Sequence, residues 1–274
     1  MKKQLCRAAL ALSLVAGVRA QPPAPTYIPQ TKFSTGQDVQ PVFEGWLRNA
    51  DGTFAMVFGY FNRNFEEELA IPAGPDNNLE PGAPDRGQPT YFLPRRQQFI
   101  FRVQVPADWG QKELIWTITA HGKTEKAYAQ LLPVEEISER MIMTRGGLNP
   151  SEDDPNQPPS ITIAQPGSAG VSSPLTLTAL VTDDGLPKPR PAPKPRPGAQ
   201  SNTVVNRPRG LNLSWLEYKG PAKVTFEPAG MIMVADGKAV TTARFTEPGT
   251  YVLRATANDG ALSTITDVTI IVGK

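Results

Sequence analysis

Residues 188–209 carry six cations and no acidic side chain. Prolines alternate with the first four cations, a pattern that favours an extended polyproline II arm rising about 3.1 Å per residue. Such an arm would bind anionic surfaces such as lipopolysaccharide phosphates, lipid headgroups or acidic glycans. The alternative is a solvated loop, in which proline and charge oppose aggregation. The candidate contacts are Lys188, Arg190, Lys194, Arg196, Arg207 and Arg209.

The chain has few residues that could carry out catalysis. His121 is the only histidine, so a Ser-His-Asp triad, a Cys-His pair or a multi-histidine zinc site would each depend on it. It precedes Gly122 in an expected hairpin turn, where an exposed polar residue is ordinary. No serine lies in a Gly-x-Ser-x-Gly sequence. We expect no enzyme activity and assign no catalytic residue, cofactor or metal site.

Two acidic stretches could instead bind calcium. Residues 76–80, DNNLE, match the first half of a calcium loop, but Pro81 replaces the required glycine and Gly87 the bidentate glutamate. The second possible calcium site would form only if residues from two separate turns met at one end of the second domain. Asp-Asp-Gly and Asn-Asp-Gly are also ordinary turn sequences, and we favour that interpretation. This second set comprises Asp183, Asp184, Asn258 and Asp259.

Two sets of residues in the first half suggest carbohydrate chemistry. Glu66, Glu67 and Glu68 could contribute to a glycosidase pair, which needs two carboxyl groups about 5 to 10 Å apart, although acids on a strand edge also prevent pairing with another chain. Aromatic side chains could line a sugar-binding platform, but a sandwich of this size needs most of them in its core. These are Trp46, Phe54, Phe58, Tyr60, Tyr91 and Trp116.

The first twenty residues have the layout of a secretory signal peptide. Cations precede the apolar run Ala8 to Val18, and Val18-Arg19-Ala20 resembles a cleavage site. The run is too short for a membrane-spanning helix of roughly 20 residues, and Cys6 lies ahead of it, so neither a transmembrane segment nor a lipid anchor is expected. Removal of residues 1–20 leaves 24 basic against 26 acidic side chains. Nucleic-acid binding, which is typical of clearly basic proteins, is therefore not expected.

The rest of the chain is punctuated by turn sequences and contains 29 prolines, about twice the usual share. In the first half, an apolar segment predicts a central strand and alternating segments predict half-buried strands. The predicted strands are 45–48, 53–61, 99–105, 114–119 and 124–131, followed by a short helix over 134–143. Residues 151–159, SEDDPNQPP, contain three prolines and no apolar side chain, and they predict an interdomain linker.

The second half predicts the seven strands of an immunoglobulin-like sandwich. Tyr251, at the start of the sixth strand, has the position of a tyrosine corner, and Leu253 stands where antibody domains place a disulfide cysteine. Trp215 is the candidate for the buried tryptophan of the third strand. The predicted strands are 160–164, 174–182, 211–217, 223–227, 239–245, 250–257 and 262–272.

The second half resembles the PKD-like branch of bacterial immunoglobulin-like domains. The resemblance is carried by TDDGLP at residues 182–187, LSW and KGPA-x-VTF within 213–226, FTEPGTYVLRATANDGALS within 243–263, and VTIIV at 268–272. It implies an adhesive, spacing or carbohydrate-associated role. The family pattern is interrupted by a Pro/Arg/Lys-rich insert at 186–210. The first half resembles modules of uncharacterised exported bacterial proteins, through FGYFNRNFEEELAIPAGPDNN and GQPTYFLPRRQQFIFRV.

These observations predict an all-β protein, with two immunoglobulin-like β-sandwich domains in tandem after a signal peptide. The domains are 21–150 and 160–274, joined by 151–159. The expected function is a non-enzymatic interaction or spacing module of the bacterial envelope, periplasmic or extracellular, whose partner is an envelope protein or glycan. The alternatives are a carbohydrate-binding protein using exposed aromatics of the first domain and a hydrolase with paired carboxylates.

Overall fold

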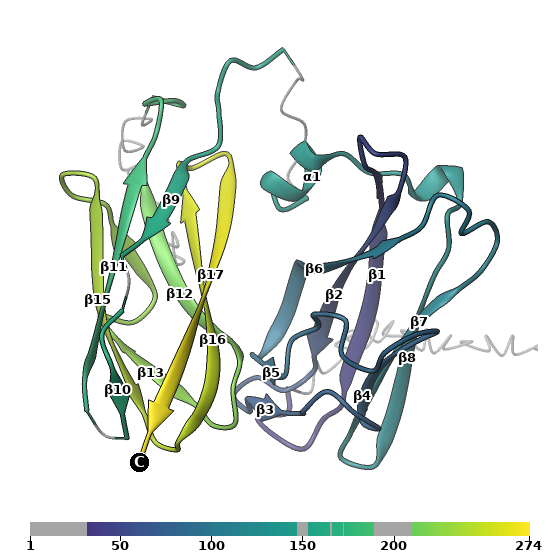
Figure 1. Ribbon diagram of the computed structural model, residues 1–274, viewed down its shortest axis with the longest axis horizontal. Coiled ribbons are helices and arrows are strands. Elements are labelled where there is room, and N and C mark those ends of the chain that lie inside the picture. Colours follow the sequence, from purple (N-terminus) through teal and green to yellow (C-terminus); the bar gives the residue numbers. More distant parts are fainter. Residues whose placement is uncertain (1–31, 147–152, 165, 172, 189–209) are drawn as a thin grey trace, which may run out of the picture. The chain divides into compact units, whose positions relative to one another are not determined.

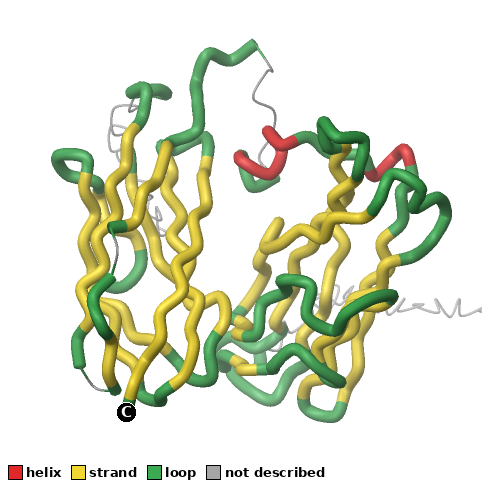
Figure 2. The backbone as a smooth tube through the Cα atoms, viewed as in Figure 1, coloured by secondary structure: helices red, strands yellow, loops and turns green. Residues whose placement is uncertain are grey.

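The computed structural model describes residues 32–146, 153–164, 166–171, 173–188 and 210–274. Figures 1 and 2 show strands throughout this part of the chain, with two short helical turns. The predicted all-β fold is confirmed. Within the described residues, no helix is long and apolar enough to cross a membrane. Residues Lys32–Lys274 cluster as one unit.

The first sandwich is built from two three-stranded antiparallel sheets and one strand pair. The predicted central position of segment 53–61 is confirmed, because β2 pairs on both sides. Three short strands, β3, β4 and β5, were not predicted. One sheet has the order β1-β2-β6, with bounds Val39–Arg48, Phe54–Asn62 and Arg95–Val105; the other has the order β4-β7-β8, with bounds Asn77–Glu80, Leu114–Ala120 and Lys123–Ala129; β3 (Leu69–Ala70) pairs with β5 (Tyr91–Phe92).

Burial explains why β2 is apolar on both faces. On one face Phe58 stacks against Phe101 at 5.3 Å between ring centroids, and Trp116 packs edge-on against both rings. On the other face Val57 belongs to a smaller cluster that Ile142 helps to cover. A strand enclosed in this way needs apolar side chains at successive positions rather than at alternate ones.

The single helix predicted over 134–143 is wrong. The segment forms the 3-10 turn η1 (Pro133–Glu135) and the α-helical turn α1 (Glu139–Met143). Between them the Ile137 amide donates to the Trp46 carbonyl at 2.9 Å, so the chain is extended there and pairs with β1. Ser138 then caps α1 by accepting a hydrogen bond from the Met141 amide.

The second sandwich contains all seven predicted strands and two short additions, β10 and β14. All described pairings are antiparallel except that of β10 with β17. One sheet has the order β10-β17-β16-β12-β14, with bounds Ala169–Gly170, Ser263–Gly273, Gly249–Asn258, Asn212–Lys219 and Met231–Met233; the other has the order β13-β15-β11-β9, with bounds Val224–Glu227, Lys238–Phe245, Leu175–Thr182 and Ser160–Ile163.

The predicted tyrosine corner is present. The Tyr251 hydroxyl donates to the Glu247 carbonyl at 2.9 Å, and the Tyr251 ring packs against Phe245. Leu253 is fully buried and belongs to the same core as Trp215. Apolar packing thus occupies the place where antibody domains have a disulfide.

Candidate functional site

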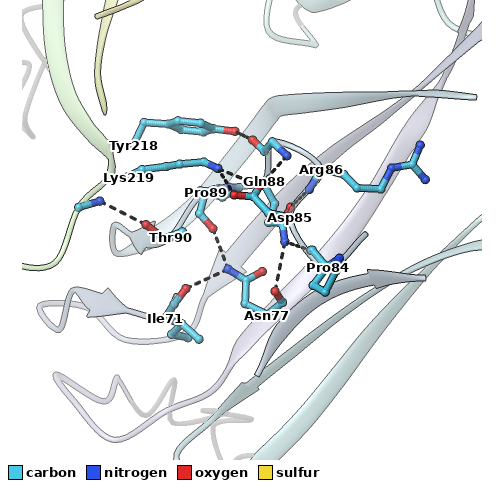
Figure 3. Close-up of polar contacts among 12 residues, drawn as sticks. Ile71, Asn77, Pro84, Asp85, Arg86, Gln88, Pro89, Thr90, Tyr218 and Lys219 are labelled. Atoms are coloured by element: carbon cyan, nitrogen blue, oxygen red, sulfur yellow. Dashed lines mark hydrogen bonds and ion pairs between the residues drawn. The ribbon is translucent and has the colours of Figure 1, made fainter. Parts of the chain in front are cut away.

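The end of β12 is hydrogen-bonded to residues 85–90 of the first sandwich (Figure 3). The Thr90 amide donates to the Tyr218 carbonyl at 3.1 Å, and the Gly220 amide donates to the Thr90 hydroxyl at 3.2 Å. Glycine is required at 220, because a Cβ there would lie 2.5 Å from Cδ1 of the buried Tyr251 ring and 2.2 Å from Glu217 Oε1. We call the contacts between residues 85–90 and 218–220 the joint.

Side chains of β12 strengthen the joint. The Tyr218 hydroxyl donates to the Gly87 carbonyl, and Lys219 Nζ lies 3.0 Å from Asp85 Oδ1. Tyr218 is only 5% exposed and packs in the hydrophobic core of the first sandwich. A side chain of one sandwich is therefore part of the core of the other.

The loop that receives β12 is itself held by Asn77 (Figure 3), and Asn77 is fully buried. Its Nδ2 donates to the carbonyls of Ile71 and Pro89 at 2.9 and 2.8 Å, and its Oδ1 accepts from Trp116 Nε1 at 3.0 Å. All hydrogen-bonding groups of this amide are thus engaged within the protein. Residues 77–80 form strand β4, so the resemblance of 76–80 to a calcium loop does not extend to its structure.

Arg254 makes a further connection between the sandwiches. Its side chain is 8% exposed and forms a two-bond ion pair with Asp267, at 2.7 and 2.8 Å. Its Nη1 also donates to the Ile100 carbonyl of β6. A buried guanidinium needs this number of partners to offset the loss of hydration.

A cluster of titratable side chains lies close to the joint. Glu68 accepts hydrogen bonds from the Tyr91 hydroxyl and from Lys223 Nζ, both at 2.7 Å. Glu217 is 3% exposed; its Oε2 accepts from the Val224 amide, and its Oε1 has no hydrogen-bond partner among the described residues. Burial raises the pKa of Glu217 to about 8, and the charge of Glu68 adds to the effect. Burial and the hydrogen bond to Glu68 likewise raise the pKa of Tyr91.

The cationic arm lies largely outside the described residues. Lys188 is described and is exposed. Arg190, Lys194, Arg196, Arg207 and Arg209 belong to residues 189–209, whose structure is not described.

The acids Glu66, Glu67 and Glu68 lie in the bend before β3 and not on a strand edge, which corrects that expectation. Glu67 accepts from the Gly36 amide at 2.7 Å and lies 3.1 Å from His121 Nε2. The only histidine therefore contacts a carboxylate at its hairpin turn. With Glu68 held by Tyr91 and Lys223, two of the three acids make structural contacts.

The polar side chains at the end of the second sandwich accept hydrogen bonds from backbone amides within their own turns. Asp183 and Asp184 accept from the amides two residues ahead at 2.9 and 2.8 Å, and Asn258 and Asp259 accept from the amides of residues 260 and 261 in the same way. Burial, followed by the charges of Asp259 and Asp184, raises the pKa of Asp183. Within the described residues, no group of three or more His, Cys, Asp or Glu side chains is arranged to hold a metal ion. The turn interpretation agrees with these contacts.

Asn156 joins this corner, and sequence reasoning missed it. The side chain is 2% exposed, and its Nδ2 donates to Asp259 Oδ2 at 3.1 Å. The nearby Gln157 amide donates to Asp184 at 2.9 Å. The described part of the segment expected as a linker therefore packs against the second sandwich.

The aromatic residues considered for a sugar platform are mostly in the core. Phe54 is half-buried and the other five are buried. Among the described residues, every ring-to-ring contact involves at least one buried ring. The interpretation that most of these six residues belong to the core is confirmed, and the alternative that they form an exposed platform is wrong.

Comparison with known proteins gives low similarity only. No family model matches the chain, and no curated protein matches it. Among solved structures, a conjugative transposon lipoprotein from Bacteroides eggerthii is 5% identical, with a TM-score of 0.29, over 41% of this chain and 96% of that one. The D00-D0 domain of intimin is 13% identical, with a TM-score of 0.28, over 86% and 100%. Domains 4 and 5 of the S-layer protein SbsC are 13% identical, with a TM-score of 0.26, over 87% and 98%.

Values this low carry no argument about the function of the chain. The assignment of the fold therefore depends on the strand order, the burial pattern and the tyrosine corner of this chain. Any functional conclusion has to come from the joint and from the charged residues described above.

Proposed function

We propose that this protein is an exported, non-enzymatic spacing and interaction module of the bacterial envelope, in which two PKD-like or immunoglobulin-like domains are held in a fixed mutual orientation. The domains would be 21–150 and 160–274, following a signal peptide at 1–20. The insertion of Tyr218 into the core of the first sandwich is the observation that supports this proposal. Two sandwiches connected only by a flexible linker would have no need of a shared core.

The distribution of reactive groups agrees with a non-enzymatic role. His121 is engaged with Glu67 in an exposed turn, and Glu68 is engaged with Tyr91 and Lys223. Both side chains thus connect parts of the fold. A spacer needs such connections, because its function is to keep its ends apart and correctly oriented.

The orientation can be measured with paired spin labels on the two sandwiches. Cysteines at the exposed positions Lys126 and Arg244 would carry the labels, with Cys6 replaced by serine. We expect one narrow distance distribution, which Tyr218→Ala broadens and the exposed control Tyr128→Ala leaves narrow. A broad distribution in the otherwise unaltered protein would show that the module is a flexible tether and would overturn the proposal.

The cationic arm is proposed as the contact with the anionic envelope surface. Replacement of Lys188, Arg190, Lys194, Arg196, Arg207 and Arg209 by serine should abolish retention on isolated envelopes at low salt and leave the melting temperature unchanged. Equal retention of the variant and the original protein would remove the arm from the functional account. Crosslinking in intact envelopes would then identify the protein or glycan partner.

A further inference from the structure

A cavity of about 200 Å³ lies between β6, α1 and the strands β12, β16 and β17. Phe99, Ile142 and Ile265 provide apolar lining, whereas Thr256 and Ser263 provide hydroxyl groups. None of these residues belongs to the joint. An apolar cavity with a few polar groups has the general composition of small-molecule sites.

The lining of the cavity has two positive charges in excess, and Asp267, outside the lining, balances one of them. Three arginines and one acid line the cavity. Arg102 pairs with Glu139 at 2.5 Å, and Arg254 pairs with Asp267 at 2.7 Å. Arg145 is exposed, and its guanidinium has no hydrogen bond or ion pair within the described part of the chain. An anionic group in the cavity would therefore find an unpaired cation.

Two residues that line the cavity have left-handed backbone conformations. Phe99, with a φ of +52°, lies at the irregularity in the pairing of β6 with β2. Arg145, with a φ of +54°, follows the C-cap residue of α1, where the Gly146 amide donates to the Met141 carbonyl in a Schellman cap. The cap therefore fixes the backbone that carries the Arg145 side chain.

The size of the cavity limits the ligand. An apolar cavity of about 150 Å³ accommodates benzene, so about 200 Å³ accommodates one ring and a small substituent. We propose that the cavity binds a monocarboxylate carrying a single aromatic ring. The ring packs against Phe99, Ile142 and Ile265, and the carboxylate pairs with Arg145. The Thr256 hydroxyl can donate a further hydrogen bond.

Phenylacetate and phenylacetamide, which differ mainly in charge, provide the test. The full chain would be titrated with each compound while amide resonances are followed by nuclear magnetic resonance. We expect saturable shifts of residues around the cavity with phenylacetate, at a dissociation constant of about 1 mM or below. Phenylacetamide should bind at least about tenfold more weakly, because it cannot pair with Arg145.

Arg145→Gln is the informative variant, and Arg244→Gln is its control at an exposed arginine away from the cavity. Arg145→Gln should weaken phenylacetate binding at least about tenfold and leave phenylacetamide binding unchanged, with a native spectrum; Arg244→Gln should change neither. Absence of saturable shifts would overturn the proposal. Three other outcomes would also overturn it, because each contradicts a carboxylate held by Arg145. They are equal binding of the two compounds by the original protein, unaltered phenylacetate binding by Arg145→Gln, and loss of the binding of both compounds in Arg145→Gln. Because both sandwiches line the cavity, this inference rests on the fixed orientation proposed above. A narrow spin-label distance distribution together with absent phenylacetate shifts would overturn the ligand site alone.

Discussion

The guanidinium carbon of Arg254 lies 3.7 Å from the centre of the Tyr218 ring. Tyr218 enters the core of the first sandwich, and Arg254 donates to the Ile100 carbonyl in the same sandwich. The two residues stand on neighbouring strands, β12 and β16, of the second sandwich. A cation stacked on an aromatic ring and screened from water gains about 2 kcal/mol, so each residue stabilises the position of the other.

Replacement of Arg254 by methionine should lower the free energy of unfolding by about 2 kcal/mol or more. The variant loses charge-assisted hydrogen bonds, each with a net value of about 1.5 to 3 kcal/mol, and leaves Asp267 without its partner. Urea unfolding followed by tryptophan fluorescence measures the change. Arg244→Met, at an exposed position, should stay within about 0.5 kcal/mol of the original. Equal midpoints for both variants would contradict the role given to Arg254.

Substitutions at Tyr218 should separate its hydroxyl from its ring. Tyr218→Phe removes only the hydrogen bond to Gly87 and should cost about 1 kcal/mol. Tyr218→Ala empties a buried site and should cost about 3 to 5 kcal/mol. Differential scanning calorimetry should show one transition in the original protein and two in Tyr218→Ala, because the shared core is lost. A single, unshifted transition in Tyr218→Ala would show that the sandwiches do not depend on this side chain.

Asn77 should tolerate no substitution well. Asn77→Ala leaves the Ile71 and Pro89 carbonyls and the Trp116 indole without partners, and should cost about 3 kcal/mol or more, since each buried unpaired group costs about 1 to 3 kcal/mol. Asn77→Asp keeps the acceptor for Trp116 but loses both donated bonds, and should also be destabilising. Chemical denaturation is the measurement, and stability equal to the original in either variant would be the contrary result.

Much of the fold could be predicted from the sequence, because strand periodicity and turn residues are local properties. The alternation in Leu175–Thr182 and Leu114–Ala120 appears directly in their burial patterns. The strands that were missed, such as Ala169–Gly170 and Met231–Met233, have two to four residues. An alternating pattern cannot be recognised over so short a length.

The joint could not be predicted in the same way. Its hydrogen-bonded side-chain partners lie 130 or more positions apart in the chain, and no local pattern reports such a contact. One further buried residue could have been found. The alternation that places Leu213 and Trp215 inside β12 also places Glu217 on the inner face, where it is buried. A carboxyl group at an inward position marks a site where charge and burial conflict.

Glu217 should make the protein less stable as the pH rises. Its pKa is about 8 in the folded protein, against an ordinary value of 4.5. Between these values the folded protein holds a proton that the unfolded chain has released. The free energy of unfolding should therefore decrease from about pH 4.5 to about pH 8, by at most about 1.4 kcal/mol per pH unit.

Urea unfolding across this pH range, on the original protein and on Glu217→Gln, measures the contribution of Glu217. The glutamine side chain stays neutral, and its oxygen can still accept a hydrogen bond from the Val224 amide. The free energy of unfolding of the variant should therefore decrease less with pH, and the variant should be the more stable protein at pH 8. Glu66→Gln removes an exposed acid and should show the same dependence of the free energy of unfolding on pH as the original protein. The charged groups near Glu217 are Glu68 and Lys223. The same slope in Glu217→Gln and in the original protein would show that another group releases the proton.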